Sequence, residues 1–204
     1  MDSTWDDSVG GFSEAAAWFA RTASLVGDRW ADPGLGEWDV RSLVGHTSRA
    51  LLTVETYLGR PASSVAVPST VGYFEATRSL AAGADVAARG RDAGGALGAD
   101  PAAAVAAVVA RVVPLVEART GEEVIETIAG GMRLADYLPT RTFELVAHTT
   151  DLAAALEVAA DVPARPALQA LTLASALAVR TGSSAQLLRA VLGRTGLPAG
   201  FTVL

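Results

Sequence analysis

The chain has 204 residues and a net charge of −6, and half of its residues are hydrophobic although only 6% are aromatic. This length is enough for one domain that buries roughly 70% of its unfolded surface, so folding requires neither a disulfide nor a metal. The acidic balance, with no basic stripe, excludes a nucleic-acid surface. Cysteine is absent, so any sulfur chemistry must come from a bound thiol.

The first seven residues, Met–Asp–Ser–Thr–Trp–Asp–Asp, are acidic and lack the basic and then apolar order of a signal peptide. The most apolar run, residues 101–116, is mostly alanine and is interrupted by Arg111 and Pro114. It is therefore too weak for a bilayer span. We expect a cytoplasmic protein that engages no membrane and exists as a monomer or a homodimer.

Helical spacing of hydrophobic residues dominates the first 120 residues. Asp39 and Asp100 stand where N-caps are expected, and Pro101 follows in the first turn of its helix. Residues 60–70 are rich in proline and serine and predict a loop that can line a pocket. The helices predicted for this part cover residues 9–27, 39–59, 73–93 and 101–119.

A different pattern follows in residues 124–128, where apolar and polar side chains alternate ahead of two glycines. This pattern predicts a short β-hairpin or an extended crossover. Residues 134–138 predict a single helical turn, and a longer helix is expected to begin at Pro139 or Thr140. Because the crossover leads directly into this helix, we expect it to form one wall of any site there.

Two further helices, over residues 167–181 and 184–192, are predicted to act as packing elements after this long helix. The tail that follows is apolar, and we expect Phe201 and Leu204 to dock on the bundle or on a partner chain. The predicted domain covers residues 1–158, with residues 159–204 as a helical extension packed on it.

The long helix carries a pair of candidate metal ligands. Glu144 and His148 are four residues apart, so they lie one turn apart on the same helical face. The helix is apolar nearly all round, which predicts a position inside the domain, where an ionised glutamate needs a compensating charge. The other histidine, His46, falls at the border of the apolar stripe of the 39–59 helix. Two imidazoles and a carboxylate suit Zn²⁺ with an open position, or Fe²⁺ or Ni²⁺.

Simpler roles compete with this interpretation. His46 could be a core-edge histidine that is hydrogen-bonded to a carbonyl. Arg141 could neutralise Glu144 from three residues away. Asp151, one turn beyond His148, could hold an imidazole N–H of a metal-bound histidine or could be an ordinary solvated aspartate.

The sequence contains three motifs in order: Trp38–Asp–Val–Arg–x–Leu–Val–x–His46, Gly131–Met–x–Leu–x–Asp–Tyr137 and Arg141–x–x–Glu144–x–x–x–His148–x–x–Asp151–Leu152. Together they resemble the mycothiol-dependent maleylpyruvate isomerase family, within the DinB-like four-helix bundles. The ending around Phe201 is similar to the tails of actinobacterial members.

The resemblance implies an all-α DinB-like four-helix bundle in which His46, Glu144 and His148 bind a divalent metal, usually zinc. It also implies that the metal takes up the thiol of mycothiol as a thiolate, which then attacks an electrophilic small molecule. Arg141 is our candidate catalytic residue, since it can orient the Glu144 carboxylate or meet an anionic substrate.

The predicted function is therefore that of a zinc-dependent thiol transferase or isomerase that uses mycothiol as cosubstrate. Two alternatives stay open. The bundle could hold a metal or a small ligand without turnover, or a metal-bound water could make it a hydrolase.

Overall fold

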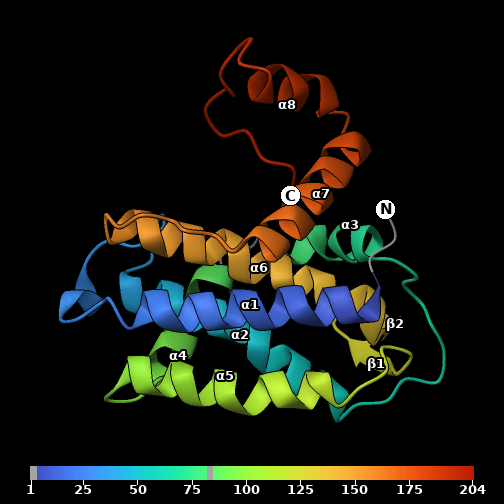
Figure 1. Cartoon of the computed structure of the whole chain (residues 1–204), viewed down its shortest axis with the longest axis horizontal. Coiled ribbons are helices and arrows are strands. Elements are labelled where there is room, and N and C mark those ends of the chain that lie inside the picture. Colours follow the sequence, from blue (N-terminus) through green and yellow to red (C-terminus); the bar gives the residue numbers. More distant parts are fainter. Residues whose placement is uncertain (1–3, 82–84) are drawn as a thin grey trace.

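The computed structural model describes residues 4–81 and 85–204. This part of the chain forms eight α-helices, a short 3-10 helix and one two-stranded sheet, which confirms the mainly helical fold (Figure 1). In chain order the elements are α1 (Trp5–Ala23), η1 (Arg29–Ala31), α2 (Val40–Leu58), α3 (Thr70–Ala81), α4 (Asp85–Ala96), α5 (Pro101–Glu117), β1 (Val124–Thr127), β2 (Gly130–Arg133), α6 (Leu134–Ala155), α7 (Ala164–Arg180) and α8 (Ser184–Val191).

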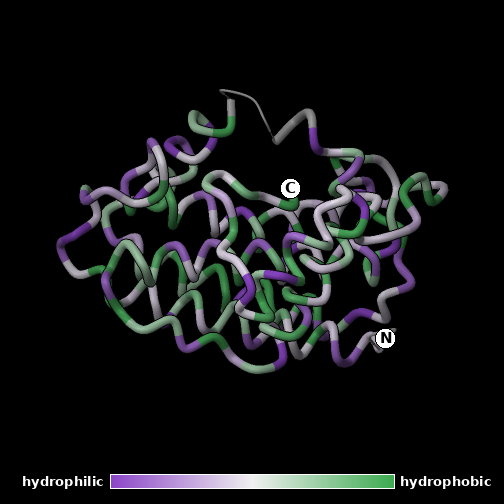
Figure 2. The backbone as a smooth tube through the Cα atoms, turned by 90° about the horizontal axis from the view of Figure 1, so that it is seen from above, coloured by the Kyte–Doolittle hydropathy of each residue, from purple (hydrophilic) through white to green (hydrophobic). Residues whose placement is uncertain are grey.

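Four helices, α1, α2, α5 and α6, form the bundle, and each of α1 and α2 packs against both α5 and α6. Hydropathy alternates along the helical turns in Figure 2, as amphipathic helices around one core require. Small side chains, among them Ala15, Ala16 and Ala50, are buried in this core. The fully buried large side chains include Phe12, Phe19, Leu43, Leu145 and Leu152.

The first helix begins earlier than predicted. The Thr4 hydroxyl accepts a hydrogen bond from the backbone N–H of Asp7 (3.2 Å), and Asp6 and Asp7 lie in the positive first turn. The start of α2 agrees with the prediction, because the Asp39 carboxylate accepts from the backbone N–H of Ser42 (2.7 Å). This cap fixes where the helix that carries His46 starts.

The single helix predicted over residues 73–93 is wrong. The structure has two helices, α3 and α4, and the part of the predicted helix at residues 82–84 lies outside the described residues. Gly94 and Gly95, which directly follow the predicted end of that helix at residue 93, lie inside α4. A Cβ on Gly94 would stand 2.8 Å from the Arg41 carbonyl oxygen, and one on Gly45 would stand 2.1 Å from the Gly94 nitrogen. These glycines therefore allow α2 and α4 to cross in contact.

The start of α6 also differs from the prediction, because the helix begins at Leu134 and includes Pro139. Proline here is the sixth helical residue and removes one N–H from the helical ladder. Burial of Leu134, Tyr137 and Leu138, all fully inaccessible, offsets that loss. The predicted separate turn and the ligand helix are thus one continuous helix.

The predicted hairpin is present as β1 and β2, paired antiparallel with Ile125 opposite Met132. The 60–70 loop, expected to line a pocket, instead runs along the hairpin. Pro61 bridges to Ile125, and the Ala66 N–H donates to the Gly131 carbonyl (2.8 Å). Gly131 is required there, since a Cβ would stand 2.0 Å from the Ser64 carbonyl oxygen.

The last helices extend away from the bundle (Figure 1). The α7 helix packs on α6, α1 and α3, while α8 packs mainly against α7 and contains no buried residue. In the described part of the chain, no single helix is long and apolar enough to cross a membrane. One pair, Val86–Ala96 with Pro101–Glu117, meets that test when taken together, and it is bent by 94°.

Candidate metal centre

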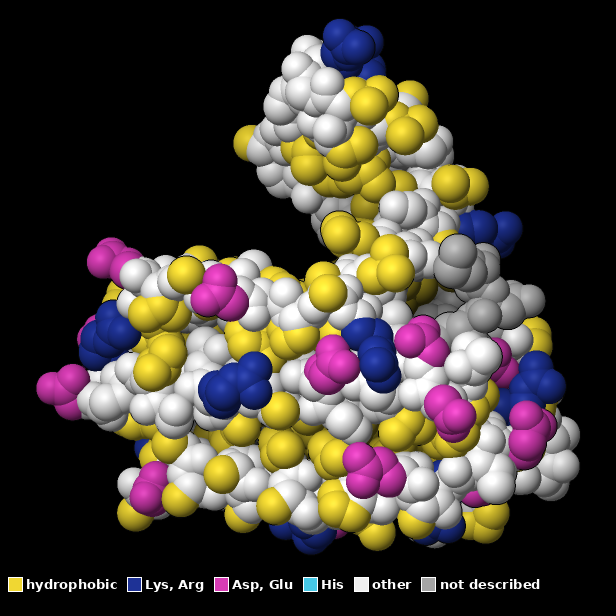
Figure 3. All heavy atoms as spheres, viewed as in Figure 1, with side chains coloured by type: hydrophobic (Ala, Val, Ile, Leu, Met, Phe, Trp, Pro, Cys, Tyr) yellow, Lys and Arg dark blue, Asp and Glu magenta, His cyan; other side chains and the backbone are white. Residues whose placement is uncertain are grey.

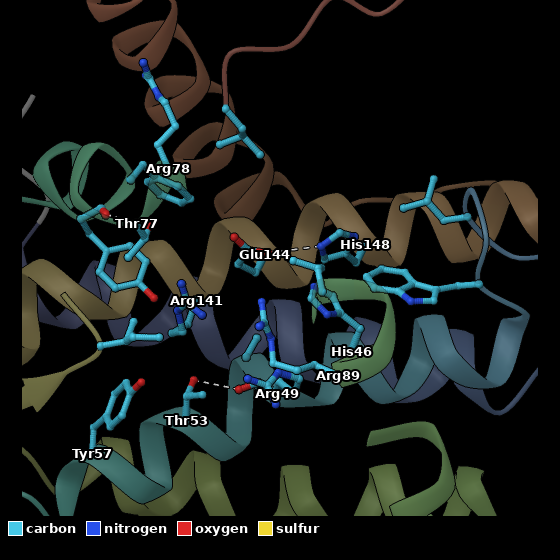
Figure 4. Close-up of a pocket in the computed structure, with 18 of the residues that line it drawn as sticks. His46, Arg49, Thr53, Tyr57, Thr77, Arg78, Arg89, Arg141, Glu144 and His148 are labelled. Atoms are coloured by element: carbon cyan, nitrogen blue, oxygen red, sulfur yellow. Dashed lines mark hydrogen bonds and ion pairs between the residues drawn. The ribbon is translucent and has the colours of Figure 1, made fainter. Parts of the chain in front are cut away.

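The three predicted ligands come together between α2 and α6 (Figure 4). One ligand atom from each of His46, Glu144 and His148 lies within 4.8 Å of the other two. Two of them share a face of α6 because they are four residues apart, and His46 reaches them from the adjacent face of α2. The packing of two bundle helices therefore assembles a ligand set whose members are distant in sequence.

Both ring nitrogens of His148 have carboxylate partners. Nε2 lies 3.2 Å from Glu144 Oε2, and Nδ1 lies 3.1 Å from Asp151 Oδ2. Burial lowers the pKa of His148, but the two carboxylates outweigh it and raise this pKa to about 9. The Asp151 contact has the geometry that orients a metal-bound imidazole, with one nitrogen held by a carboxylate and the other turned to the metal.

The imidazole of His46 has a different environment. No hydrogen bond to this ring occurs within the described residues, and its Nδ1 atom is buried without a partner. This absence disagrees with a core histidine bonded to a carbonyl. Burial, and then the charge of His148, lower the pKa of His46 to about 4. The ring is therefore neutral at pH 7, as a metal ligand must be.

The carboxylate of Glu144 completes the set. Burial acts to raise its pKa, but the His148 hydrogen bond and the charge of Arg141 lower it to about 2. An ionised oxygen beside one unpartnered imidazole and one carboxylate-oriented imidazole is a donor set that fits a divalent cation such as Zn²⁺. The residues present thus fit a bound metal.

Arg141 occupies a buried position on α6, with 8% of its surface exposed. Its Nε donates to Thr140 Oγ1 (2.8 Å), and its guanidinium carbon lies 5.0 Å from the ring centroids of Tyr73 and Tyr137. No carboxylate of the described residues lies within ion-pair distance of it. The simple ion pair with Glu144 is therefore not formed, and aromatic faces stabilise this cation instead.

A cavity of about 460 Å³ opens over the ligands. Its aromatic wall includes Trp38, whose ring centroid lies 4.5 Å from the ring centroid of His46. The indole Nε1 of Trp38 donates to the Ala87 carbonyl (3.1 Å). Ile128 lines the cavity from the hairpin turn, which confirms that the crossover forms a wall. Leu204 of the tail also lines the cavity, but 51% of its surface stays exposed, so it covers the bundle only in part.

The cavity is cationic apart from the three candidate metal ligands. Glu144 is the one acidic residue among the described residues that line it, against four arginines. Arg49 follows His46 by three residues, so helical spacing could have revealed it. Arg78 and Arg89 come from α3 and α4, and no sequence signal connected them with the site. The four arginines are Arg49, Arg78, Arg89 and Arg141 (Figure 4).

A four-helix bundle that presents two imidazoles and a carboxylate from two adjacent helices defines the protein as a DinB-like helical bundle with a candidate metal site. A comparison of the chain with known protein families then identifies its family. The mycothiol maleylpyruvate isomerase N-terminal domain matches residues 12–153, and the chain belongs to this family. The matched segment contains all three candidate ligands and ends before α7. Neither the curated proteins nor the solved structures gave a match.

Proposed function

We propose that this protein is a metal-dependent thiol transferase or isomerase that uses mycothiol. One divalent ion, zinc as first choice, would be held by His46, Glu144 and His148. The observation that carries the proposal is the meeting of these three ligand atoms within 4.8 Å at a cavity, in a chain of this family. Absence of cysteine agrees with a thiol that enters as cosubstrate.

The bound metal would supply a Lewis acid that keeps the thiol sulfur ionised at neutral pH. Two residues next to the candidate ligands, Asp151 and Trp38, would keep the two imidazoles ready for the metal. A hydrogen bond from His148 Nδ1–H to Asp151 would leave the lone pair of Nε2 for the metal. Trp38 covers the His46 ring and limits water on that side.

The arginines of the cavity support an electrophile that carries a carboxylate or another anionic group. Guanidinium groups match carboxylates geometrically and stay charged at every physiological pH. Arg141 is the residue we assign to this contact. It is fixed between Tyr73 and Tyr137, lines the same cavity as Glu144, and has no carboxylate partner among the described residues.

Turnover with defined thiols tests this function. The zinc-loaded protein is mixed with mycothiol and either an anionic or a neutral electrophile, and adduct or isomer formation is followed by mass spectrometry. We expect turnover that requires both metal and mycothiol. Arg141→Gln is expected to keep the metal and to lose at least about 100-fold in kcat/KM for the anionic electrophile, which corresponds to about 2.7 kcal/mol.

The neutral electrophile is the control, because its kcat/KM should change little in Arg141→Gln. Metal binding without turnover of any electrophile would make the protein a binding module. Thiol-independent hydrolysis would instead identify a hydrolase with a metal-bound water.

A further inference from the structure

The arm, which we define as residues 162–204, differs in charge from the rest of the chain. It contains four arginines and no aspartate or glutamate. Residues 1–161, which we call the body, contain 12 arginines and 22 acidic residues and so carry a charge of −10. A cationic arm is therefore attached to a strongly acidic body.

The root of the arm is anchored by specific contacts. Gln169 Nε2 donates to the Asp7 carbonyl (2.8 Å), and a Cβ on Gly11 would stand 2.0 Å from the Gln169 side-chain oxygen. Arg180 pairs with Glu75 of α3 (2.7 Å). These contacts fix the direction in which α7 leaves the bundle, so the arm's position is built into the fold.

Both helices of the arm expose apolar side chains. On α7 the exposed side chains follow helical spacing on the face opposite the buried one, and on α8 they lie at i, i+3 and i+4. Figure 3 shows hydrophobic side chains gathered on the visible face of the arm, which stands away from the body. The six most exposed large hydrophobic side chains of the arm are Leu168 (64% exposed), Leu171 (67%), Val179 (65%), Leu188 (58%), Val191 (71%) and Leu192 (65%).

The size of this surface matches a protein interface. At roughly 70 Å² for each two-thirds exposed side chain, the six present on the order of 400 Å² of apolar area. A standard interface takes about 800 Å² from each partner, a little over half of it apolar. The arm alone thus supplies about the apolar area that one partner contributes.

The charges indicate which partner fits. Arg165 and Arg180 already pair with carboxylates of their own body, at 3.5 Å from Glu14 and 2.7 Å from Glu75. Arg189 and Arg194, at the outer end, have no carboxylate within ion-pair distance among the described residues. An acidic surface would complement this end of the arm, and the body of a second copy is acidic in the same way as the body that pairs with the root.

We propose that the arm docks on the body of a second copy of this chain, and that two copies exchange arms about a twofold axis. In such a dimer each arm–body contact is made twice, which doubles the apolar area buried. A membrane surface fits less well. The exposed side chains are split between two helices, and α8 has only eight residues, whereas helices that lie in a bilayer interface are commonly much longer.

Docking would also act on the candidate metal centre. After α8 the chain returns to the bundle, where Val203 packs against the core and Val203 and Leu204 line the cavity. A second copy that holds α8 would therefore fix one wall of the cavity.

Sedimentation velocity over a concentration series tests the proposal. The 204-residue chain weighs 20.8 kDa, and we expect it to sediment with twice that mass at micromolar concentration. Leu188→Glu places a charge in the apolar stripe and should raise the dimer dissociation constant at least about tenfold, by the 1.4 kcal/mol that such a change represents. Higher salt should raise it as well, because the arginine contacts are screened.

Gln186→Glu is the matched control, since it adds the same charge at an exposed α8 position on the opposite face and should leave the dimer intact. A wild-type monomer at 100 µM or so would overturn the proposal. So would a dimer that responds equally to both substitutions, because its interface would lie elsewhere. A monomer that co-sediments with phosphatidylserine vesicles would overturn it in favour of a membrane partner.

Discussion

The imidazole rings of His46 and His148 stand almost perpendicular to each other, with centroids 4.8 Å apart and planes at 86°. One ring comes from α2 and the other from α6, so their contact exists only when the two helices are packed. Their protonation differs as well, since the pKa of His46 is lowered to about 4 and that of His148 is raised to about 9. One histidine is ready to bind a metal at pH 7, and the other must first lose a proton.

Removing the carboxylate of Glu144 is expected to abolish metal binding. Loss of an orienting partner outside the ligand set typically costs 10–100-fold in affinity, so loss of a ligand should cost at least about 100-fold. After equilibration with zinc and dialysis, elemental analysis should find about one zinc per chain in the wild type and almost none in Glu144→Gln. Competition with a chelating dye gives the affinities.

Glu55→Gln serves as the control for this experiment. Glu55 is also on a bundle helix, but it pairs with Arg111 (2.6 Å) and lies outside the candidate ligand set. Its loss should leave the zinc content unchanged. Equal zinc content in Glu144→Gln and wild type would refute the ligand assignment.

Zinc binding at pH 7 should release about one proton. In the metal-free protein at pH 7, His148 is protonated and His46 is neutral. Glu144 is ionised, since the pKa of this carboxyl is lowered to about 2. Only His148 must therefore lose a proton to become a ligand. The affinity should rise about tenfold for each pH unit between pH 6 and 8, because this range lies below the raised pKa of His148 and above that of His46.

Calorimetric titration in two buffers with different ionisation enthalpies measures the number of protons released. Asp151→Asn removes one of the two carboxylates that raise the pKa of His148, so this variant should release fewer protons at pH 7. Zinc binding with no proton release in the wild type would contradict the assignment of a protonated His148.

Much of the candidate site could be predicted from the sequence because helical periodicity is a local property. The four-residue spacing places Glu144 and His148 on one face whatever surrounds the helix. His46 needed the packing of α2 against α6, which spacing cannot give. It was joined to the pair because the chain has only two histidines, and the resemblance then supported the set. Arg78 and Arg89 were missed, since they reach the cavity from helices whose placement depends on tertiary contacts.

The errors in the fold have a similar origin. The predicted helix stops at residue 93, just before Gly94, because glycine weakens an isolated helix, but Gly94 lets α4 approach the backbone of α2. Pro139 was interpreted as a helix start, although burial of Leu134 and Tyr137 extends α6 on its N-terminal side. In both cases packing overrode a local preference.

Two substitutions of Tyr137 should separate its hydroxyl from its ring. The hydroxyl donates to Thr53 Oγ1 (2.9 Å), so Tyr137→Phe loses one buried hydrogen bond and should lower the free energy of unfolding by about 1 kcal/mol. Tyr137→Leu also removes an aromatic face from Arg141 and leaves a void, which should cost at least about 3 kcal/mol. Urea unfolding of the metal-free proteins measures both. Similar losses would show that the aromatic face contributes little.

Alanine at two neighbouring glycines of α4 should change stability in opposite directions. A Cβ at Gly94 would stand 2.8 Å from the Arg41 carbonyl oxygen, and backbone atoms cannot rotate away as a side chain can. Gly94→Ala must therefore separate α2 from α4 and should lower the free energy of unfolding by about 1–3 kcal/mol. At Gly95 a Cβ meets nothing within 4 Å, so Gly95→Ala should raise it by roughly 0.5–1 kcal/mol.

Urea unfolding of the metal-free variants gives the two free energies, and zinc affinity provides a second measurement. Gly45, which precedes His46 directly, meets Gly94 across the same crossing. A shift of α2 that relieves the Gly94→Ala clash therefore moves a candidate ligand, so this variant should also bind zinc more weakly, whereas Gly95→Ala should bind it normally. If both alanines stabilised the protein, α2 and α4 would not be in backbone contact, and the position of His46 would not depend on α4.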